Sequence, residues 1–434
     1  MRVIRESTHR FATLAAALVL ACSCSRPPCS RPPNSPATSS PAEVDTARLE
    51  DDAIARQTEG DYAAAEPLFR QCLGIRRIQL GPEHIDTLAA MNNLANLLHE
   101  AGRDDEAEGL HRECLAARLR TLGEAHPHTL ASLNNLGLVV HARGSLVDAE
   151  ILYRRAWEAM KSSAGPDHPD TLSNLNNLAN VLSDQGKYPE AETLYRGLVL
   201  VLERTQGPDH PATLAGRGNL ANCLLRKGDP WAAGSIYREC LATRERVQGK
   251  LHPETLLALS NLAGYHFEIE DFRECERLHR RCLEGRLQAL GPDHPDTLAS
   301  GLHLAKVLRK NQRLPEAASQ ARSAVADISR VLGPEHPETF DALSTLADIV
   351  AAGGDPERAA ELYEKALEGL RETRGFRHPE TLTVLYEISQ LRRAQGQDVV
   401  ARRLAYELAA GARRTLAPQH PDRIKYEKYQ ATFR

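Results

Sequence analysis

The chain of 434 residues has few aromatic side chains, little net charge and no CxxC pair. Aromatic residues make up 5% of the sequence and hydrophobic residues 42%, which excludes a large aromatic core and is typical of helices packed through Leu and Ala. The formal net charge of −4 lacks the basic excess that nucleic-acid binding needs. The sequence also lacks a Gly-rich phosphate loop, an HExxH motif and a GxSxG motif. We therefore expect no enzyme, no cofactor and no nucleic-acid partner.

The cysteines are odd in number, nine, and most of them occupy positions where other parts of the chain carry alanine. One such position, repeated at multiples of 42 residues, alternates between Cys and Ala: Cys72, Cys114, Ala156, Cys240, Cys282, Ala324 and Ala366. A small apolar slot that accepts either residue is a packing position. This pattern favours structural cysteines, Cys275 included, over redox or metal chemistry.

The first 41 residues are typical of a targeting segment and a tether. Arg2, Arg5 and Arg10 precede an apolar run, residues 11–21, that is too short to cross a bilayer as an ordinary helix. The run ends at Cys22 and resembles a bacterial lipobox, whose cysteine is lipidated. We expect a signal peptide over residues 1–22 and a disordered Pro/Ser-rich tether over 23–41. The resemblance implies a lipid-anchored protein of the bacterial cell envelope, on the periplasmic or outer-membrane side. The alternative is a plain secretory signal that is cleaved nearby, and no other stretch of the sequence could span a membrane.

A period of 42 residues runs through the rest of the chain without an insertion. Its marker is a histidine that Pro follows in every copy but the first, where Ile85 stands. Thr stands three residues after each marker except the last. The markers are His84, His126, His168, His210, His252, His294, His336, His378 and His420. Metal–nitrogen bonds of about 2 Å cannot join points that stacked helices hold about 8–10 Å apart, so we expect these histidines to cap helices and to bind no metal.

Each period contains two amphipathic segments. After His84, the residues Leu88, Met91, Ala95 and Leu98 form a helical stripe, and Pro favours the first turn of such a helix. A glycine closes this helix in most copies, where a left-handed residue is wanted. Glu270 and Gln312 replace the glycine, which suggests two turns of different construction. The second segment has a stripe of apolar residues that we expect to be buried. In the first copy this stripe consists of Ala65, Leu68, Phe69, Cys72 and Leu73.

This pattern resembles tetratricopeptide repeats, specifically the 42-residue repeats of kinesin light chains. The matching motifs are the NNLA box at residues 92–95, 134–137 and 176–179, the Gly-x-Tyr turn at 60–62 and 186–188, the run Glu190 to Arg196, and the linker LGxxHPxTL. The resemblance implies an all-α, right-handed superhelical solenoid over residues 42–434, built of about nine antiparallel helix pairs plus a C-terminal capping helix. It implies that the first helix of each pair lines the concave surface.

Asparagines recur on the non-core face of the first helices. Because Asn carries both donors and acceptors, a row of them can hold the main chain of an extended peptide, and the resemblance implies the same role. The alternative is that these residues pair with neighbouring helices and space the repeats. The candidates are Asn93, Asn96, Asn135, Asn177, Asn180, Asn219, Asn222 and Asn261. Farther along, Lys306, Arg309 and Lys310 would suit an acidic side chain or a C-terminal carboxylate, unless they are simply solvated.

These features together predict a scaffold that binds a peptide or protein partner in a concave, Asn-lined groove, and that touches a membrane only through Cys22. The alternative is a structural lipoprotein that contacts other subunits of an envelope assembly through its convex faces.

The anchor is tested by Cys22→Ala, which should abolish partitioning of the mature protein into detergent, because the lipid supplies the membrane affinity. Detergent phase separation of envelope fractions measures this. Wild-type protein recovered from the soluble periplasmic fraction, beginning at Ser23 or later, would contradict the anchor.

Overall fold

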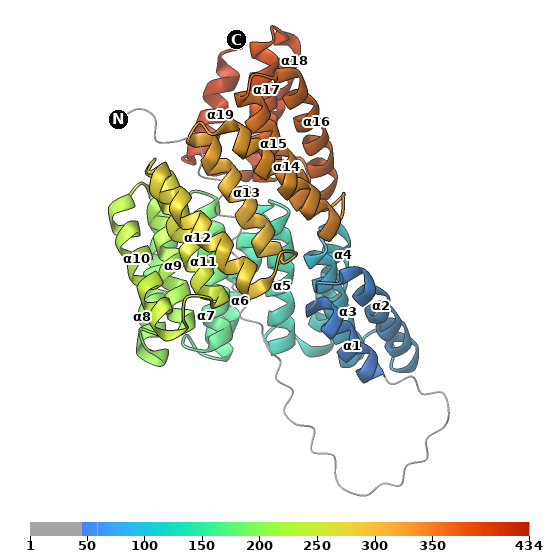
Figure 1. The fold of residues 1–434 in the computed structure, drawn as a ribbon. Helices are drawn as coiled ribbons and strands as arrows, with labels where there is room; N and C mark the ends of the chain where they lie inside the picture. The colour runs from blue at the N-terminus through green and yellow to red at the C-terminus, as the bar shows by residue number, and fades with distance from the viewer. Residues whose placement is uncertain (1–45, 59, 434) are drawn as a thin grey trace, which may run out of the picture. The chain divides into compact units, whose positions relative to one another are not determined.

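The computed structural model describes residues 46–58 and 60–433, which form nineteen helices and no strand. The odd-numbered helices are called A helices here: α1 (Thr46–Thr58), α3 (Ile85–Glu100), α5 (Pro127–Ala142), α7 (Pro169–Asp184), α9 (Pro211–Lys227), α11 (Pro253–Glu268), α13 (Pro295–Lys310), α15 (Pro337–Ala352), α17 (Pro379–Ala394) and α19 (Pro421–Ala431). The even-numbered ones are the B helices: α2 (Tyr62–Gln79), α4 (Asp104–Leu122), α6 (Leu146–Ser163), α8 (Tyr188–Gln206), α10 (Pro230–Val247), α12 (Phe272–Leu290), α14 (Leu314–Val331), α16 (Pro356–Thr373) and α18 (Asp398–Thr415). Nine pairs plus a final helix confirm the predicted all-α array (Figure 1).

The signal peptide, Cys22 and the tether lie outside the described residues. None of the helices in the described part is long and apolar enough to span a membrane.

The helices belong to two compact units. The described part of the smaller unit is residues 46–58, 60–139 and 155–173, and that of the larger unit is residues 140–154 and 174–433. Within each unit, helices that follow one another in the sequence pack together, α1 to α4 in the smaller and α8 to α19 in the larger. Within these two runs, each A helix that has a B helix on both sides packs against both of them.

Apolar stripes hold each pair together, as the periodicity predicts. In the smaller unit, Leu88, Met91, Ala95 and Leu98 of α3 are at most 1% exposed. The Cys/Ala slot is also confirmed as a packing position, because the thiols of the B helices are buried and unpaired with one another. Burial of this kind raises the pKa of the Cys282 thiol, so these cysteines are poor nucleophiles.

The histidines cap the A helices. In all nine copies the marker's Nδ1 accepts a hydrogen bond from the backbone N–H two residues on, over 3.1–3.2 Å. A ring nitrogen thus does the work that Ser, Thr, Asp or Asn side chains usually do at a helix start. In three copies the threonine that follows also joins the new helix to the preceding loop, as Thr213 does by donating to the Gly207 carbonyl over 2.8 Å.

The turns at Glu270 and Gln312 are built like the others, which corrects the prediction from sequence. Both residues adopt φ of 61°, the left-handed conformation that the glycines adopt at this position. Around Gln312, the amide of Arg313 donates to Leu308 and that of Gln312 to Arg309, at 2.9 and 3.0 Å. These two bonds define a Schellman motif, whose geometry requires a left-handed residue whatever its side chain.

Helices far apart in the sequence meet within the larger unit. A Cβ added to Gly144 would lie 2.8 Å from the Cα of His378, and one added to Gly186 would lie 2.9 Å from the His420 ring. The amide of Ala417 also donates to the carbonyl of Gln185 over 3.1 Å. The starts of α17 and α19 therefore rest on the turns that precede α6 and α8.

We predict that Gln312→Gly stabilises the protein by about 1 kcal/mol, because glycine adopts the left-handed conformation without the Cβ clash. The urea midpoint, followed by circular dichroism, measures the effect. Gly354→Ala is the matched control and should act in the opposite direction, since Gly354 has φ of 87° and open space around it. A lower midpoint for Gln312→Gly would contradict the interpretation.

Candidate functional site

Asparagines on the A helices form hydrogen bonds from one repeat to the next. In the smaller unit, Asn135 donates to Asn92 over 3.0 Å and Asn93 donates to Glu50 over 2.7 Å. In the larger unit, Asn219 donates to Asn176 over 2.8 Å. The two residues of each pair lie 43 positions apart, one more than the repeat length, because the A helices of successive repeats contact each other through the same pair of faces. These contacts are those expected of asparagines that space the repeats.

Asn180 and Asn222, which lie one helical turn from the row, pair within their own repeats. The hydroxyl of Tyr195 on α8 donates to Asn180 on α7, and the hydroxyl of Tyr237 on α10 donates to Asn222 on α9. These bonds join the two helices of each pair. Asn177 is only 7% exposed, which corrects the expectation that the whole row lies on the solvent side of its helices.

The remaining hydrogen-bonding capacity of the row is considerable. An Asn side chain offers two donor hydrogens and two acceptor sites, and the hydrogen bond of Asn219 to Asn176 uses one donor. Asn93, Asn135, Asn219 and Asn261 are partly exposed, so their free groups reach solvent. Asn261 forms no side-chain hydrogen bond within the described part of the chain, because Gly218 stands 43 residues before it. The row can therefore space the repeats and still bind a ligand.

A cavity of about 100 Å³ lies where the row continues among α13, α15 and α17. Its lining includes His303 and Thr345, which occupy the repeat position of Asn93. Lys306 also lines it. Its neighbour Lys310 instead lies 5.9 Å from the ring centres of Phe267 and Phe272. The predicted cation cluster therefore contributes one residue, Lys306, to the lining.

The charged lining of the cavity is mostly acidic. Arg374 forms ion pairs with Asp341, over 3.2 Å, and with Glu380. Glu338 has no ion pair and no side-chain hydrogen bond among the described residues. Burial and the adjacent Asp341 carboxylate raise the pKa of Glu338 to about 6. The nearby Arg374 guanidinium acts in the opposite direction, but the pKa remains raised overall. The cavity thus contains a carboxylate that has no ion pair of its own in the described part of the chain.

Neither Glu338 nor Ile328, which also lines the cavity, was predicted from the sequence. The sequence does contain a signal for them. The position ten residues before the acid at the start of an A helix carries Arg76, Arg244 and Arg286 in three repeats, but in this repeat it carries Ile328.

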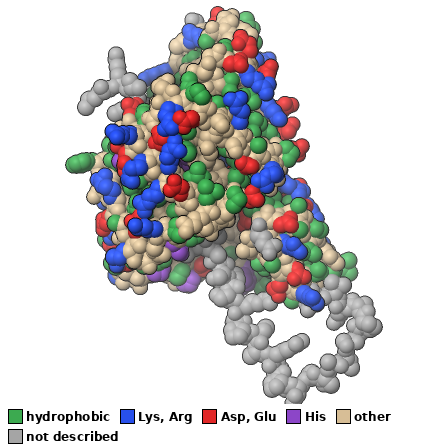
Figure 2. All heavy atoms as spheres, viewed as in Figure 1, with side chains coloured by type: hydrophobic (Ala, Val, Ile, Leu, Met, Phe, Trp, Pro, Cys, Tyr) green, Lys and Arg blue, Asp and Glu red, His purple; other side chains and the backbone are tan. Residues whose placement is uncertain are grey.

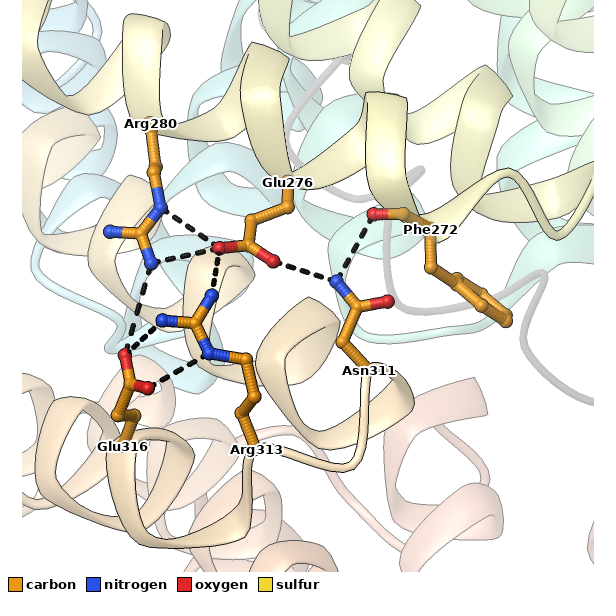
Figure 3. Close-up of polar contacts among 6 residues, drawn as sticks. All are labelled: Phe272, Glu276, Arg280, Asn311, Arg313 and Glu316. Carbon is orange, nitrogen blue, oxygen red and sulfur yellow. Dashed lines mark hydrogen bonds and ion pairs between the residues drawn. The ribbon is translucent and has the colours of Figure 1, made fainter.

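The B helices carry a different pattern, in which opposite charges of successive repeats compensate one another. Glu276 on α12 accepts hydrogen bonds from Arg280 over 2.9 Å, from Asn311 over 2.7 Å and from Arg313 over 2.6 Å (Figure 3). Burial raises the pKa of Glu276, but these donors outweigh it and lower the pKa overall. Positive and negative side chains are interspersed on the face that Figure 2 shows. The B helices therefore use their charges for stacking.

Comparison with known families matches the tetratricopeptide repeat at residues 53–120, 101–162, 128–196, 170–246, 219–288, 254–326 and 297–372. The chain belongs to the tetratricopeptide repeat family. Comparison with curated proteins finds no match. This tetratricopeptide repeat array has the fold of protein–protein interaction scaffolds.

Solved structures similar to the array include kinesin light chain-like proteins. A Podosopora anserina protein of that type, with nearly identical TPR-like repeats, is 25% identical, with a TM-score of 0.43 over 48% of this chain and 99% of its own. BtubC from P. vanneervenii is 20% identical, with a TM-score of 0.41 over 58% and 95%. A Rap protein complexed with the Competence and Sporulation Factor is 10% identical, with a TM-score of 0.56 over 90% and 100%. The last similarity shows a shared fold.

We predict that Asn219→Ala destabilises the array by about 0.5–1.5 kcal/mol, the net contribution of its hydrogen bond to Asn176. Asn261→Ala, which removes no hydrogen bond, should leave the urea midpoint unchanged or slightly raised, because Ala is the better helix former. Equal effects of the two substitutions would show that the bond to Asn176 does not stabilise the stack.

Proposed function

We propose that this protein is an interaction scaffold that binds an extended peptide segment of a partner along the Asn-bearing face of its A helices. The observation that carries the proposal is the partly exposed row of asparagines with unused donors and acceptors. Such groups can pair with the N–H and C=O of any extended main chain, whatever its side chains. The proposed face therefore recognises conformation, and specificity has to come from pockets beside it.

The Rap similarity supports the proposal. That protein shares the fold over its whole length and was captured in complex with the Competence and Sporulation Factor. A helical array of this kind therefore accommodates a bound partner. The proposal includes the lipid anchor at Cys22, which would hold the scaffold at the bacterial envelope through the tether.

The alternative is a structural subunit that contacts its partners through the B helices. An observation that favours it is Trp231 on α10, which is 86% exposed, because Trp is enriched in interface cores. Against it, many charged side chains of the B helices are already paired with each other. Trp231→Ala is therefore the matched variant for the opposite face.

The proposed face is tested with a random library of capped twelve-residue peptides retained on immobilised full-length protein. Asn219→Ala and Asn261→Ala combined should weaken retention by about 1–3 kcal/mol, or roughly 5- to 150-fold, if each side chain holds one main-chain group. Trp231→Ala should retain as much as wild type.

Folding of each variant is checked by its urea midpoint in parallel. Undiminished retention by the Asn variant would rule out this face, and loss of retention only with Trp231→Ala would establish the alternative.

A further inference from the structure

A buried arginine neutralises the acid at the start of the next A helix in two repeats of the larger unit. Arg244 lies 2.8 Å from the Glu254 carboxylate, and Arg286 lies 3.9 Å from that of Asp296. Arg286 also donates to the Asp296 carbonyl over 2.8 Å. Both guanidinium groups are at most 4% exposed. This part of the repeat is therefore shaped to hold a guanidinium group beside a carboxylate.

The other repeats without that arginine use one of two solutions. In the first, the acid is absent or exposed: Ala212 stands after Leu202, and the Asp170 side chain after Met160 is 47% exposed. In the second, another basic side chain lies near the acid: Arg374 pairs with Glu380 after Leu370, and His420 lies 3.7 Å from the buried Asp422 after Ala412. Both solutions avoid the cost of burying a carboxylate far from any cation.

The repeat of α14 and α15 departs from both solutions. Ile328 stands where the arginine would be, Glu338 keeps its carboxylate, and the cavity of about 100 Å³ lies beside both of them. Typical small-molecule pockets measure about 300–1,000 Å³, so this cavity suits a single side chain. Leu302 and Val384 supply apolar walls on which the methylene groups of a long side chain can pack.

We propose that this cavity receives a lysine or arginine side chain of the bound peptide, whose positive charge takes the place of the missing arginine beside Glu338. This inference rests on the proposed function, because His303 and Thr345, which line the cavity, occupy the repeat position of the asparagines on the proposed peptide face. It also gives that face a side-chain preference, which the asparagines alone cannot supply.

The charges of the lining decide between a basic and an acidic side chain. An acidic side chain would bring another carboxylate near Glu338 and Asp341, and Arg374 is already engaged with Asp341 and Glu380. Lys306 is the other cation of the lining, and it too has an interaction partner in the structure. A basic ligand therefore replaces the acidic one that the sequence around Lys306 suggested.

The test sequences the peptides that full-length wild-type protein, Ile328→Arg and Glu338→Gln retain from the random library. Wild type should enrich Lys or Arg at one position by about ten-fold or more over Glu and Met. Ile328→Arg fills the cavity with an internal guanidinium group, and Glu338→Gln removes the charge at constant shape. The Ile328→Arg and Glu338→Gln variants should both lose this enrichment of about ten-fold. They should still retain a total amount of peptide similar to that of wild type. Ile328→Leu, the apolar control, should keep the enrichment.

The outcomes separate the two proposals. Enrichment that persists in Glu338→Gln, or enrichment of Glu in wild type, overturns the basic-side-chain inference and leaves the peptide face intact. No retention of any peptide by wild type overturns the proposed function and the inference with it. If Ile328→Arg does not fold, Glu338→Gln decides, because it preserves the volume of the side chain.

Discussion

The hydrogen bond from a backbone amide to a histidine ring nitrogen sets the start of every A helix in the described part of the chain except α1. Because the acceptor lies two residues before its donor, the bond fixes where the A helix begins, and the proline that follows in most copies fits the first turn. In three copies a threonine bond to the preceding loop, as from Thr339 to Gly333, also holds the helix to what precedes it. Because the histidine cap recurs every 42 residues, the helices begin in the same register, and the asparagines that pair between repeats do so at a constant offset of 43 residues.

Constant offset explains why the asparagines and the charged residues of the B helices both form repeated contacts. The constant offset also makes a break in the repetition informative. When one residue differs, the surrounding side chains keep the positions they have in the other repeats, and the partner of the replaced residue is left without its usual contact. Ile328 is such a break, and its consequence is that the Glu338 carboxylate has no arginine paired with it among the described residues. A preference for particular side chains is expected at departures from the repeat, because the repeated asparagines recognise only the main chain of a peptide.

The sequence was sufficient for the fold, because helix pairs, caps and apolar stripes are set by residues close together in the chain. The sequence was insufficient for features that depend on the three-dimensional geometry of the backbone or on how one repeat packs against the next. Gln312 looked like a break in the turn, but the backbone bonds of Arg313 impose the left-handed conformation on it. The bond of Asn219 to Asn176 depends on how far one helix is rotated against the next, which no local pattern encodes. The cavity at Glu338 likewise depends on how α13, α15 and α17 are placed against one another, so it could not be predicted from local sequence.

The central claim is that a peptide lies on the A helices rather than on the B helices. Photo-crosslinking tests it most directly, with a benzophenone amino acid at position 261 on α11 or, as the comparison, at the exposed position 200 on α8. The account predicts that irradiation with the retained peptides gives covalent adducts at position 261 and none at position 200. Adducts at position 200 alone would contradict it.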